Sequence, residues 1–282
     1  MTVDSHQHFW HYHPDTHGWI TPAMSVLRRD YLPADLEPEL RDHGITGCVA
    51  VQAAQTAGET DFLLRLANEN PFILGVVGWL DLRSDTLPEQ LEAYSAFPKL
   101  KGLRHIVQDE PDDRFMLQPG FLRGIGELAR FGLTYDILIY PRQLPAAAEL
   151  ARRFPQQRFI LDHLAKPDIR RKPDAAWRDG LQALAAHPNV SCKLSGMVTE
   201  AAHGAWREAD FRPFLDLAFE AFGPERLLFG SDWPVCLLSA RYGEVAGIVR
   251  NYLADVPLSV REAVMGGNAR TFYNLTAYGP RT

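Results

Sequence analysis

The sequence has few of the features of a secreted protein. Only three cysteines occur among its 282 residues, and the spacing of Cys48, Cys192 and Cys236 matches no metal-binding motif. Each lies in or beside an apolar run, and a sparse, odd set of cysteines is typical of buried thiols in a reducing compartment. The opening MTVDSHQHFW lacks the charged and apolar regions of a signal peptide. We therefore expect a cytoplasmic protein.

Long hydrophobic runs and basic runs are also missing. The longest apolar runs, such as the one from Phe72 to Leu80, are far too short to cross a bilayer. The net charge is −6, and no basic run or basic helical face stands out, which argues against a nucleic-acid partner. We therefore expect a protein that binds neither a membrane nor nucleic acid. The composition is compatible with a homo-oligomer.

What the sequence does contain is a regular alternation of β-rich and helical segments. Hydrophobic residues make up 46% of the chain, so a large core can be buried. No GxGxxG or Walker motif favours an open, doubly wound sheet. The alternation therefore predicts an α/β protein with a single domain over residues 1–282, a (β/α)8 TIM barrel. The eight predicted strands are Val3–Phe9, Gly47–Ala53, Ile73–Leu80, Leu100–Val107, Leu133–Tyr140, Arg158–His163, Val190–Leu194 and Leu227–Phe229.

Helical patterns fill the gaps between these strands. One or two further helices are expected after Leu253, ending near Tyr273–Leu275. The segment from Trp10 to Leu36 is predicted to be a long loop over the catalytic face, because loops that leave the carboxyl ends of barrel strands build that face. The clearest predicted helices are Thr60–Asn70, Phe121–Phe131, Leu144–Phe154, Ala175–Ala186, Phe211–Phe222 and Arg241–Leu253.

Two histidines stand at the end of the first predicted strand. Residues two apart on a strand point the same way, so His6 and His8 should project together, with Asp4 on the same side. Two imidazoles on one inward face can bind one divalent ion or polarise one carbonyl. The alternative is a pair of structural polar residues at a strand end.

Polar residues also end other predicted strands. His163 ends the sixth strand, on the face of Phe159 and Leu161, and Asp232 follows the eighth. Asp232 is either a catalytic base or a buried partner for a cation, and His163 could instead be a hydrogen-bonded core histidine. Asp162 is expected to face the helical layer with a structural partner.

Further charged residues lie within strands, where they are costly unless paired or used. Arg104 and His105 are adjacent, so at most one of them points straight inward. Arg104 could be an ion-pair partner, and Lys193 could cap a helix or pair with an outer carboxylate. We expect three other histidines to be surface loop residues, namely His11, His13 and His17.

Several segments resemble a known family. They are DSHQHFW at 4–10, GWI at 18–20, GVVGWLDL at 75–82, KGLRHIVQDEPDDRFM at 101–116, LDHLAKP at 161–167, NVSCKLSGM at 189–197, FGSDWPV at 229–235 and GNARTFYNL at 267–275. Nearly end to end, the chain resembles the sugar-lactonase branch of the amidohydrolase superfamily (amidohydrolase family 2), which includes L-fuconolactonases and L-rhamnonolactonases. LDHLAKP, CKLSG and FGSDWPV together are the most specific of these motifs.

The resemblance implies a TIM barrel with its site at the carboxyl ends of the strands. His6 and His8 would bind a divalent ion, if one is bound, together with Asp232, which would also act as general base. His163 would be the sixth-strand histidine of the site. Lys101 lies out of step with Arg104, so no lysine is placed to be carboxylated as a bridging ligand. We therefore expect one divalent ion at most, with zinc as the best candidate, or none.

The resemblance also implies a small lactone as the substrate, most simply a neutral sugar-acid lactone of the L-fucono- or L-rhamnonolactone type. Asp232 would activate the attacking water, and His163 or the two first-strand histidines could donate to the oxyanion. The candidate substrate-binding residues are Arg104, His105, Trp19, Lys193 and Trp233, with Trp79 as a further possible wall.

Three alternatives to this function remain. A metal-dependent decarboxylase of the same superfamily would use the same histidines and aspartate. A lactonase acting on a pyrone dicarboxylate or a muconolactone should need several inward arginines, and only Arg104 stands out. A non-catalytic binding barrel is disfavoured, because the residues at all four core positions are present.

Overall fold

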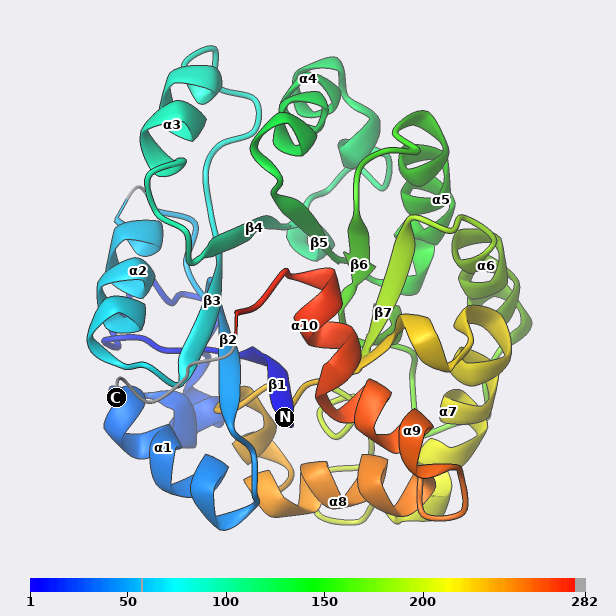
Figure 1. Ribbon diagram of the computed structural model, residues 1–282. Coiled ribbons are helices and arrows are strands. Elements are labelled where there is room, and N and C mark those ends of the chain that lie inside the picture. The colour runs from blue at the N-terminus through cyan, green and yellow to red at the C-terminus, as the bar shows by residue number, and fades with distance from the viewer. Residues whose placement is uncertain (57, 277–282) are drawn as a thin grey trace.

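Eight parallel strands follow one another in chain order around a barrel (Figure 1). The computed structural model describes residues 1–56 and 58–276. The predicted (β/α)8 barrel is confirmed, and the predicted strands are observed, most of them shortened by one or two residues at an end. They are β1 (Val3–Gln7), β2 (Gly47–Val51), β3 (Ile73–Gly78), β4 (Leu100–Ile106), β5 (Thr134–Leu138), β6 (Phe159–Leu161), β7 (Val190–Leu194) and β8 (Leu227–Phe229).

Helices surround the strands as an outer layer (Figure 1). The six clearest predicted helices are all observed, with ends that differ by up to three residues. No helix of residues 1–56 and 58–276 is long and apolar enough to cross a membrane. The helices are α1 (Pro33–Asp42), α2 (Glu59–Glu69), α3 (Leu87–Tyr94), α4 (Pro119–Leu128), α5 (Leu144–Arg153), α6 (Ala175–Ala185), α7 (Glu208–Phe222), α8 (Tyr242–Tyr252), α9 (Leu258–Glu262) and α10 (Asn268–Phe272).

The loop predicted after β1 is shorter than expected. Residues 33–36, which were predicted to end the loop, belong instead to α1, which begins at Pro33. Proline suits the first turn of a helix because its fixed φ is helical and it lacks the N–H that would have no partner there. The Asp35 carboxylate accepts the Leu32 N–H at 2.9 Å and closes this first turn. The loop itself contains a 3-10 helix, Pro22–Leu27.

The seam of the barrel joins β1 to the segment that follows β8. The Asp232 N–H donates to the His6 carbonyl at 2.8 Å, and the His8 N–H donates to the Trp233 carbonyl at 2.7 Å. Ser5 Oγ also donates to the Phe229 carbonyl at 2.6 Å. The backbone that closes the barrel therefore carries four of the predicted site residues, namely His6, His8, Asp232 and Trp233.

The barrel interior is apolar at its amino-terminal end and charged above it. Tyr273 and Leu275, which follow α10, pack with inward-facing aliphatic residues of the strands, and α10 lies over this end of the barrel (Figure 1). A buried layer of acidic and basic side chains lies above this apolar cluster. The apolar members from the strands are Val3, Val49, Val51, Leu74, Val77, Ile160 and Leu228.

Candidate active site

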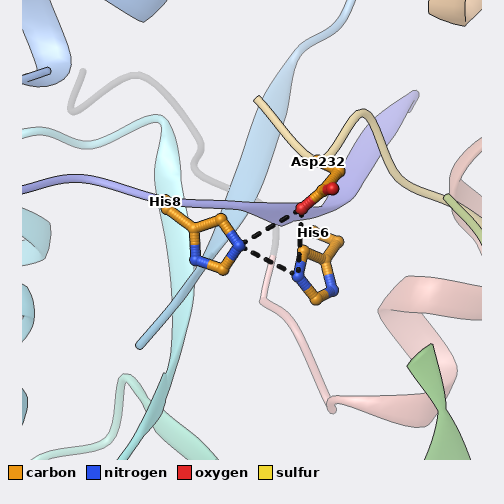
Figure 2. Close-up of side chains that lie close together, drawn as sticks. All are labelled: His6, His8 and Asp232. Carbon is orange, nitrogen blue, oxygen red and sulfur yellow. Dashed lines mark hydrogen bonds and ion pairs between the residues drawn. The ribbon is translucent and has the colours of Figure 1, made fainter. Parts of the chain in front are cut away.

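Four of the predicted site residues meet at the carboxyl ends of β1, β6 and β8. The Oδ1 atom of Asp232 lies 3.3 Å from His8 Nε2, 3.7 Å from His6 Nε2 and 3.8 Å from His163 Nε2. Figure 2 shows one Asp232 carboxylate oxygen facing both first-strand imidazoles, whose Nε2 atoms are 3.2 Å apart. All four side chains are almost completely buried. The predicted convergence of these side chains is therefore observed.

Strand alternation explains only part of this cluster. Phe159 faces the helices and Ile160 faces the barrel interior, so alternation points Asp162 inward and His163 outward. The prediction that Asp162 faces the helical layer is therefore wrong. His163 enters the site because its backbone turns left-handed, with φ of 54°.

Asp4 departs from the prediction as well. The pairing of β1 with β2 shifts register between Asp4 and Gln7, so the alternation from Asp4 to His6 is broken. The Asp4 carboxylate instead accepts hydrogen bonds from Ser231 N at 2.9 Å and from Tyr242 Oη of α8 at 3.0 Å. It therefore braces the start of β1 against the helical layer and lies outside the cluster.

Hydrogen bonds on the far nitrogens orient two of the imidazoles. His8 Nδ1 donates to the Val51 carbonyl at 2.8 Å, which leaves the His8 Nε2 lone pair facing Asp232. His163 Nδ1 lies 2.8 Å from Ser195 Oγ, so its Nε2 also faces the carboxylate. Partners of this kind on the second ring nitrogen fix the tautomer and orientation of metal-binding and catalytic histidines.

The donor set fits one divalent metal ion. One ligand atom each from His6, His8 and Asp232 lies within 4.8 Å of the others, and imidazole with carboxylate is a ligand set that suits zinc. Arg104 Nη1 lies 3.2 Å from His6 Nε2, so this contact must loosen for His6 to bind a metal. Lys101 Nζ donates to the Asn274 carbonyl at 3.0 Å, away from the cluster, as expected for a residue that is not a bridging ligand.

A network of buried charges lies directly beneath His6. Lys193 Nζ lies 3.0 Å from Asp162 Oδ1, 3.1 Å from His6 Nδ1 and within hydrogen-bond distance of Asp136 Oδ2. Arg104 Nη1 contacts Asp162 Oδ2 at 3.0 Å. The two cations therefore face two carboxylates, and all four side chains are nearly inaccessible.

Burial and neighbouring charges set the protonation of the cluster. Burial raises the pKa of Asp232, but the facing histidines, His163 foremost, outweigh this effect and hold that pKa below its usual range. Burial lowers the pKa of His163 to about 4, although Asp232 opposes this effect. Asp232 is therefore ionised near neutral pH, and His163 is neutral.

A pocket opens above the cluster. It contains about 500 Å³ of empty space, part of which is open to the solvent. His8, His163 and Asp232 contribute to its lining, and its walls combine apolar and polar side chains. The other lining residues are Trp19, Ala53, Arg104, Ile106, Gln108, Asp109, Leu138, Lys166 and Val235.

Only two of the predicted substrate-binding residues line this pocket, namely Trp19 and Arg104. His105 faces outward, as alternation requires, where it stacks on Phe115 and pairs with Glu110 at 2.7 Å.

The other two predicted substrate-binding residues are buried elsewhere. Lys193 is fully buried within the charge network, and the Trp233 ring packs against Phe9 and Tyr31. Trp79 contacts His105 rather than the pocket. Prediction of these residues as substrate contacts is therefore not supported by the geometry.

Sequence reasoning missed other polar residues near the site. Asp136 was detectable, because it is a charge within a predicted strand. Gln52 was detectable only as a polar residue at a strand end. Its side-chain oxygen accepts two hydrogen bonds from the Arg104 guanidinium, at 2.7 and 2.9 Å. Lys166 and Asp109 lie in loops, where nothing in the residue pattern showed that they line the pocket.

Comparisons with known proteins agree with this architecture. The amidohydrolase family profile matches residues 3–275. The chain is 44% identical to an L-fucono-1,5-lactonase of Burkholderia multivorans, over 98% of this chain and 96% of that protein. It is 37% identical to an L-fucono-1,5-lactonase of Burkholderia ambifaria, over 97% and 95% of the two proteins. An amidohydrolase crystal structure from Burkholderia multivorans with bound zinc has 42% identity and a TM-score of 0.94, covering 98% of this chain and 100% of that one. The chain belongs to the amidohydrolase family.

Proposed function

We propose that this protein hydrolyses a sugar-acid lactone of the L-fucono-1,5-lactone type. The two L-fucono-1,5-lactonases to which it is similar cover nearly its whole length and support this substrate class. The observation that carries the proposal is the buried carboxylate of Asp232 facing three imidazoles at the floor of a small-molecule pocket. This arrangement can deprotonate a water beside a bound carbonyl group.

In the proposed reaction, Asp232 removes a proton from water as that water attacks the lactone carbonyl. A base must be ionised to act, and the lowered pKa of Asp232 keeps it so. The ester bond to the ring oxygen then breaks, and protonated Asp232 returns the proton to the leaving alkoxide. The product is the open hydroxy acid, and one water is consumed.

The tautomers of the imidazoles divide the remaining roles. Neutral His8 has its proton on Nδ1, bound to the Val51 carbonyl, so its Nε2 cannot donate to an oxyanion. Ser195 Oγ can donate to His163 Nδ1, which leaves a proton on His163 Nε2 at the floor of the pocket. We therefore assign oxyanion stabilisation to His163 and to the neighbouring cation Arg104.

We also propose that His6, His8 and Asp232 hold a zinc ion. The donor chemistry supports this ion, and a similar amidohydrolase has been crystallised with zinc. When bound, zinc supplies Lewis acidity that lowers the pKa of a water or polarises a carbonyl. Elemental analysis of untagged protein should find no more than one zinc per chain, and His8→Ala should reduce that content. Two ions per chain would contradict the assignment.

The charges around the pocket favour a neutral substrate over a dicarboxylate. Arg104 and Lys166 are the cations among the lining residues, and Arg104 is already engaged by Gln52, His6 and Asp162. A pyrone dicarboxylate carries two fixed negative charges, which these groups would not balance because Asp109 and Asp232 also line the pocket. A polyhydroxylated ring needs a mixture of donors and acceptors, and this mixture is present.

The proposal is tested with a panel of sugar-acid lactones in a pH-indicator assay. We expect acid release from L-fucono-1,5-lactone well above its spontaneous opening, and loss of that rate in Asp232→Asn. Wild-type protein that releases carbon dioxide from aromatic acids, or that opens pyrone dicarboxylates while ignoring sugar lactones, would show the assignment to be wrong.

The three cysteines support a proposed location in the cytoplasm. Cys48, Cys192 and Cys236 are all free and buried. Burial raises the pKa of each thiol above its usual range. Unreactive buried thiols are what a reducing compartment permits.

A further inference from the structure

An unusual run of backbone conformations follows β6. Four consecutive residues have positive φ, with 54° at His163, 53° at Leu164, 59° at Ala165 and 53° at Lys166. None is glycine, and L-residues adopt this left-handed conformation at an energetic cost. Strain of this kind persists only where the surroundings enforce it, and it concentrates at functional sites.

The surroundings of this turn hold it firmly. The Lys166 N–H donates to the His163 carbonyl at 2.7 Å, which closes the turn. The Trp177 indole Nε1 of α6 donates to the Leu164 carbonyl at 2.8 Å. The side chains of Leu164 and Ala165 are completely buried. The middle of the turn therefore anchors it, while its two ends, His163 and Lys166, line the pocket.

The role of His163 accounts for only one end of the turn. At the other end, the Lys166 ammonium lies 5.7 Å from the centre of the Tyr140 ring. Within residues 1–56 and 58–276, no hydrogen bond or ion pair engages Lys166 Nζ. A half-buried lysine beside an active-site cluster thus keeps its donors available for a ligand.

Acceptors accompany this donor around the pocket. Asp109 lines the same pocket as Lys166. Glu200 lies close enough for the charge of Lys166 to oppose the rise that burial causes in the pKa of Glu200. The pocket lining therefore carries Lys166 as a cationic donor and Asp109 as an anionic acceptor, and its apolar wall includes Trp19, Ile106 and Leu138.

We propose that Lys166 and Asp109 form a specificity subsite that binds ring hydroxyl groups of the lactone, away from the carbonyl that reacts over Asp232. A hydroxyl group both donates and accepts, so a lysine and a carboxylate together can read two hydroxyls of one configuration. This inference rests on the proposed function and names the part of the site that selects among sugar lactones.

The decisive experiment pairs a lysine variant with altered substrates. Lys166→Met removes the donors and keeps a long flexible side chain. Its kcat/KM should fall about 10- to 100-fold on the preferred lactone, the range for losing a hydrogen bond to a charged group. The exposed Lys172, in the loop before α6, provides a matched control. Lys172→Met removes one positive charge, as Lys166→Met does, and should leave kcat/KM unchanged.

Deoxy lactones distinguish substrate contact from a structural role. On the one deoxy analogue that lacks the contacted hydroxyl, wild type and Lys166→Met should have equal kcat/KM, while their difference should persist on the other analogues. Asp109→Asn should show the same pattern for the hydroxyl that donates to it. An equal loss on every analogue, or no loss at all, would overturn the subsite.

Binding to an inactive variant separates this inference from the proposed reaction. Calorimetry with L-fucono-1,5-lactone and its deoxy analogues on Asp232→Asn, with and without Lys166→Met, needs no turnover. If wild type opens no sugar lactone but Lys166→Met weakens lactone binding in the hydroxyl-dependent way, the reaction is wrong and the subsite stands. If Lys166→Met leaves the dissociation constants unchanged, the subsite is wrong whatever the turnover.

Discussion

Two buried aspartates of this site, Asp232 and Asp162, should respond in opposite ways to the same substitution. Asp232 faces imidazoles, of which His163 is neutral near pH 7, and it lies outside the lysine and arginine network. Asp162, in contrast, contacts the two buried cations Lys193 and Arg104. Replacement by asparagine keeps the shape of either side chain and removes its charge.

The expected magnitudes follow from these partners. Asp232→Asn should lower kcat by about 10²- to 10⁴-fold, the range for losing a general base. In metal-free protein it should leave stability nearly unchanged, because no buried lysine or arginine loses its counterion. Asp162→Asn removes the carboxylate that Arg104 contacts and one of the two that Lys193 contacts, which should cost about 3–5 kcal/mol. For a chain of this size, about 2–4 °C per kcal/mol corresponds to a fall in Tm of about 6–20 °C.

Thermal melting and lactone turnover measured on the same two preparations provide the assay. The reasoning about Asp232 would be refuted if Asp232→Asn melted normally and retained a kcat within about tenfold of wild type, below the general-base range. The reasoning about the charge network would be refuted if Asp162→Asn melted within about 2 °C of wild type, less than the shift for 1 kcal/mol. Either result could occur without the other, so the two assignments are tested separately.

Two further predictions concern packing around the site. A Cβ added at Gly196, where φ is +63°, would lie 2.5 Å from His163 Nδ1. Gly196→Ala should therefore displace that imidazole and lower kcat at least tenfold. The control is Gly204→Ala, which should keep wild-type turnover because Gly204 has a similar φ of +70° and a Cβ there would meet nothing within 4 Å. Equal activities in a lactone assay would contradict this prediction. Tyr273→Phe removes the 2.7 Å hydrogen bond to Asp136 and should cost about 1–3 kcal/mol in denaturant unfolding, as for a buried charged acceptor that loses a donor, with kcat changed little. Unchanged stability would show that this bond contributes nothing.

The fold could be predicted because its signals are local. Apolar strands of fixed spacing, separated by helical patterns, specify a barrel, and the motifs around His6, His163 and Asp232 resembled the family to which the chain belongs. The projection of His6 and His8 to one side followed from strand periodicity and is observed.

The rest of the site depends on backbone geometry that periodicity does not describe. Alternation indicated that Asp162 and His163 leave the sixth strand on opposite faces, but it did not show which face is inward. Asp162 faces inward, and the left-handed turn then brings His163 in as well. The register shift in β1 redirected Asp4 in the same manner. Lys166 escaped notice because a residue in a loop has no period from which its direction can be inferred.

Because the seam of the barrel joins the two ends of the chain, the active site can form only after almost the whole chain has been synthesised. The residues that bind across the seam come from opposite ends of the chain, with His6 and His8 emerging first and Asp232 more than two hundred residues later. A nascent chain that stops before β8 can begin to order its early strands, but it cannot assemble the carboxylate with the imidazoles. Truncated products should therefore be inert, and no partly competent hydrolase is exposed to the cell before the barrel is complete.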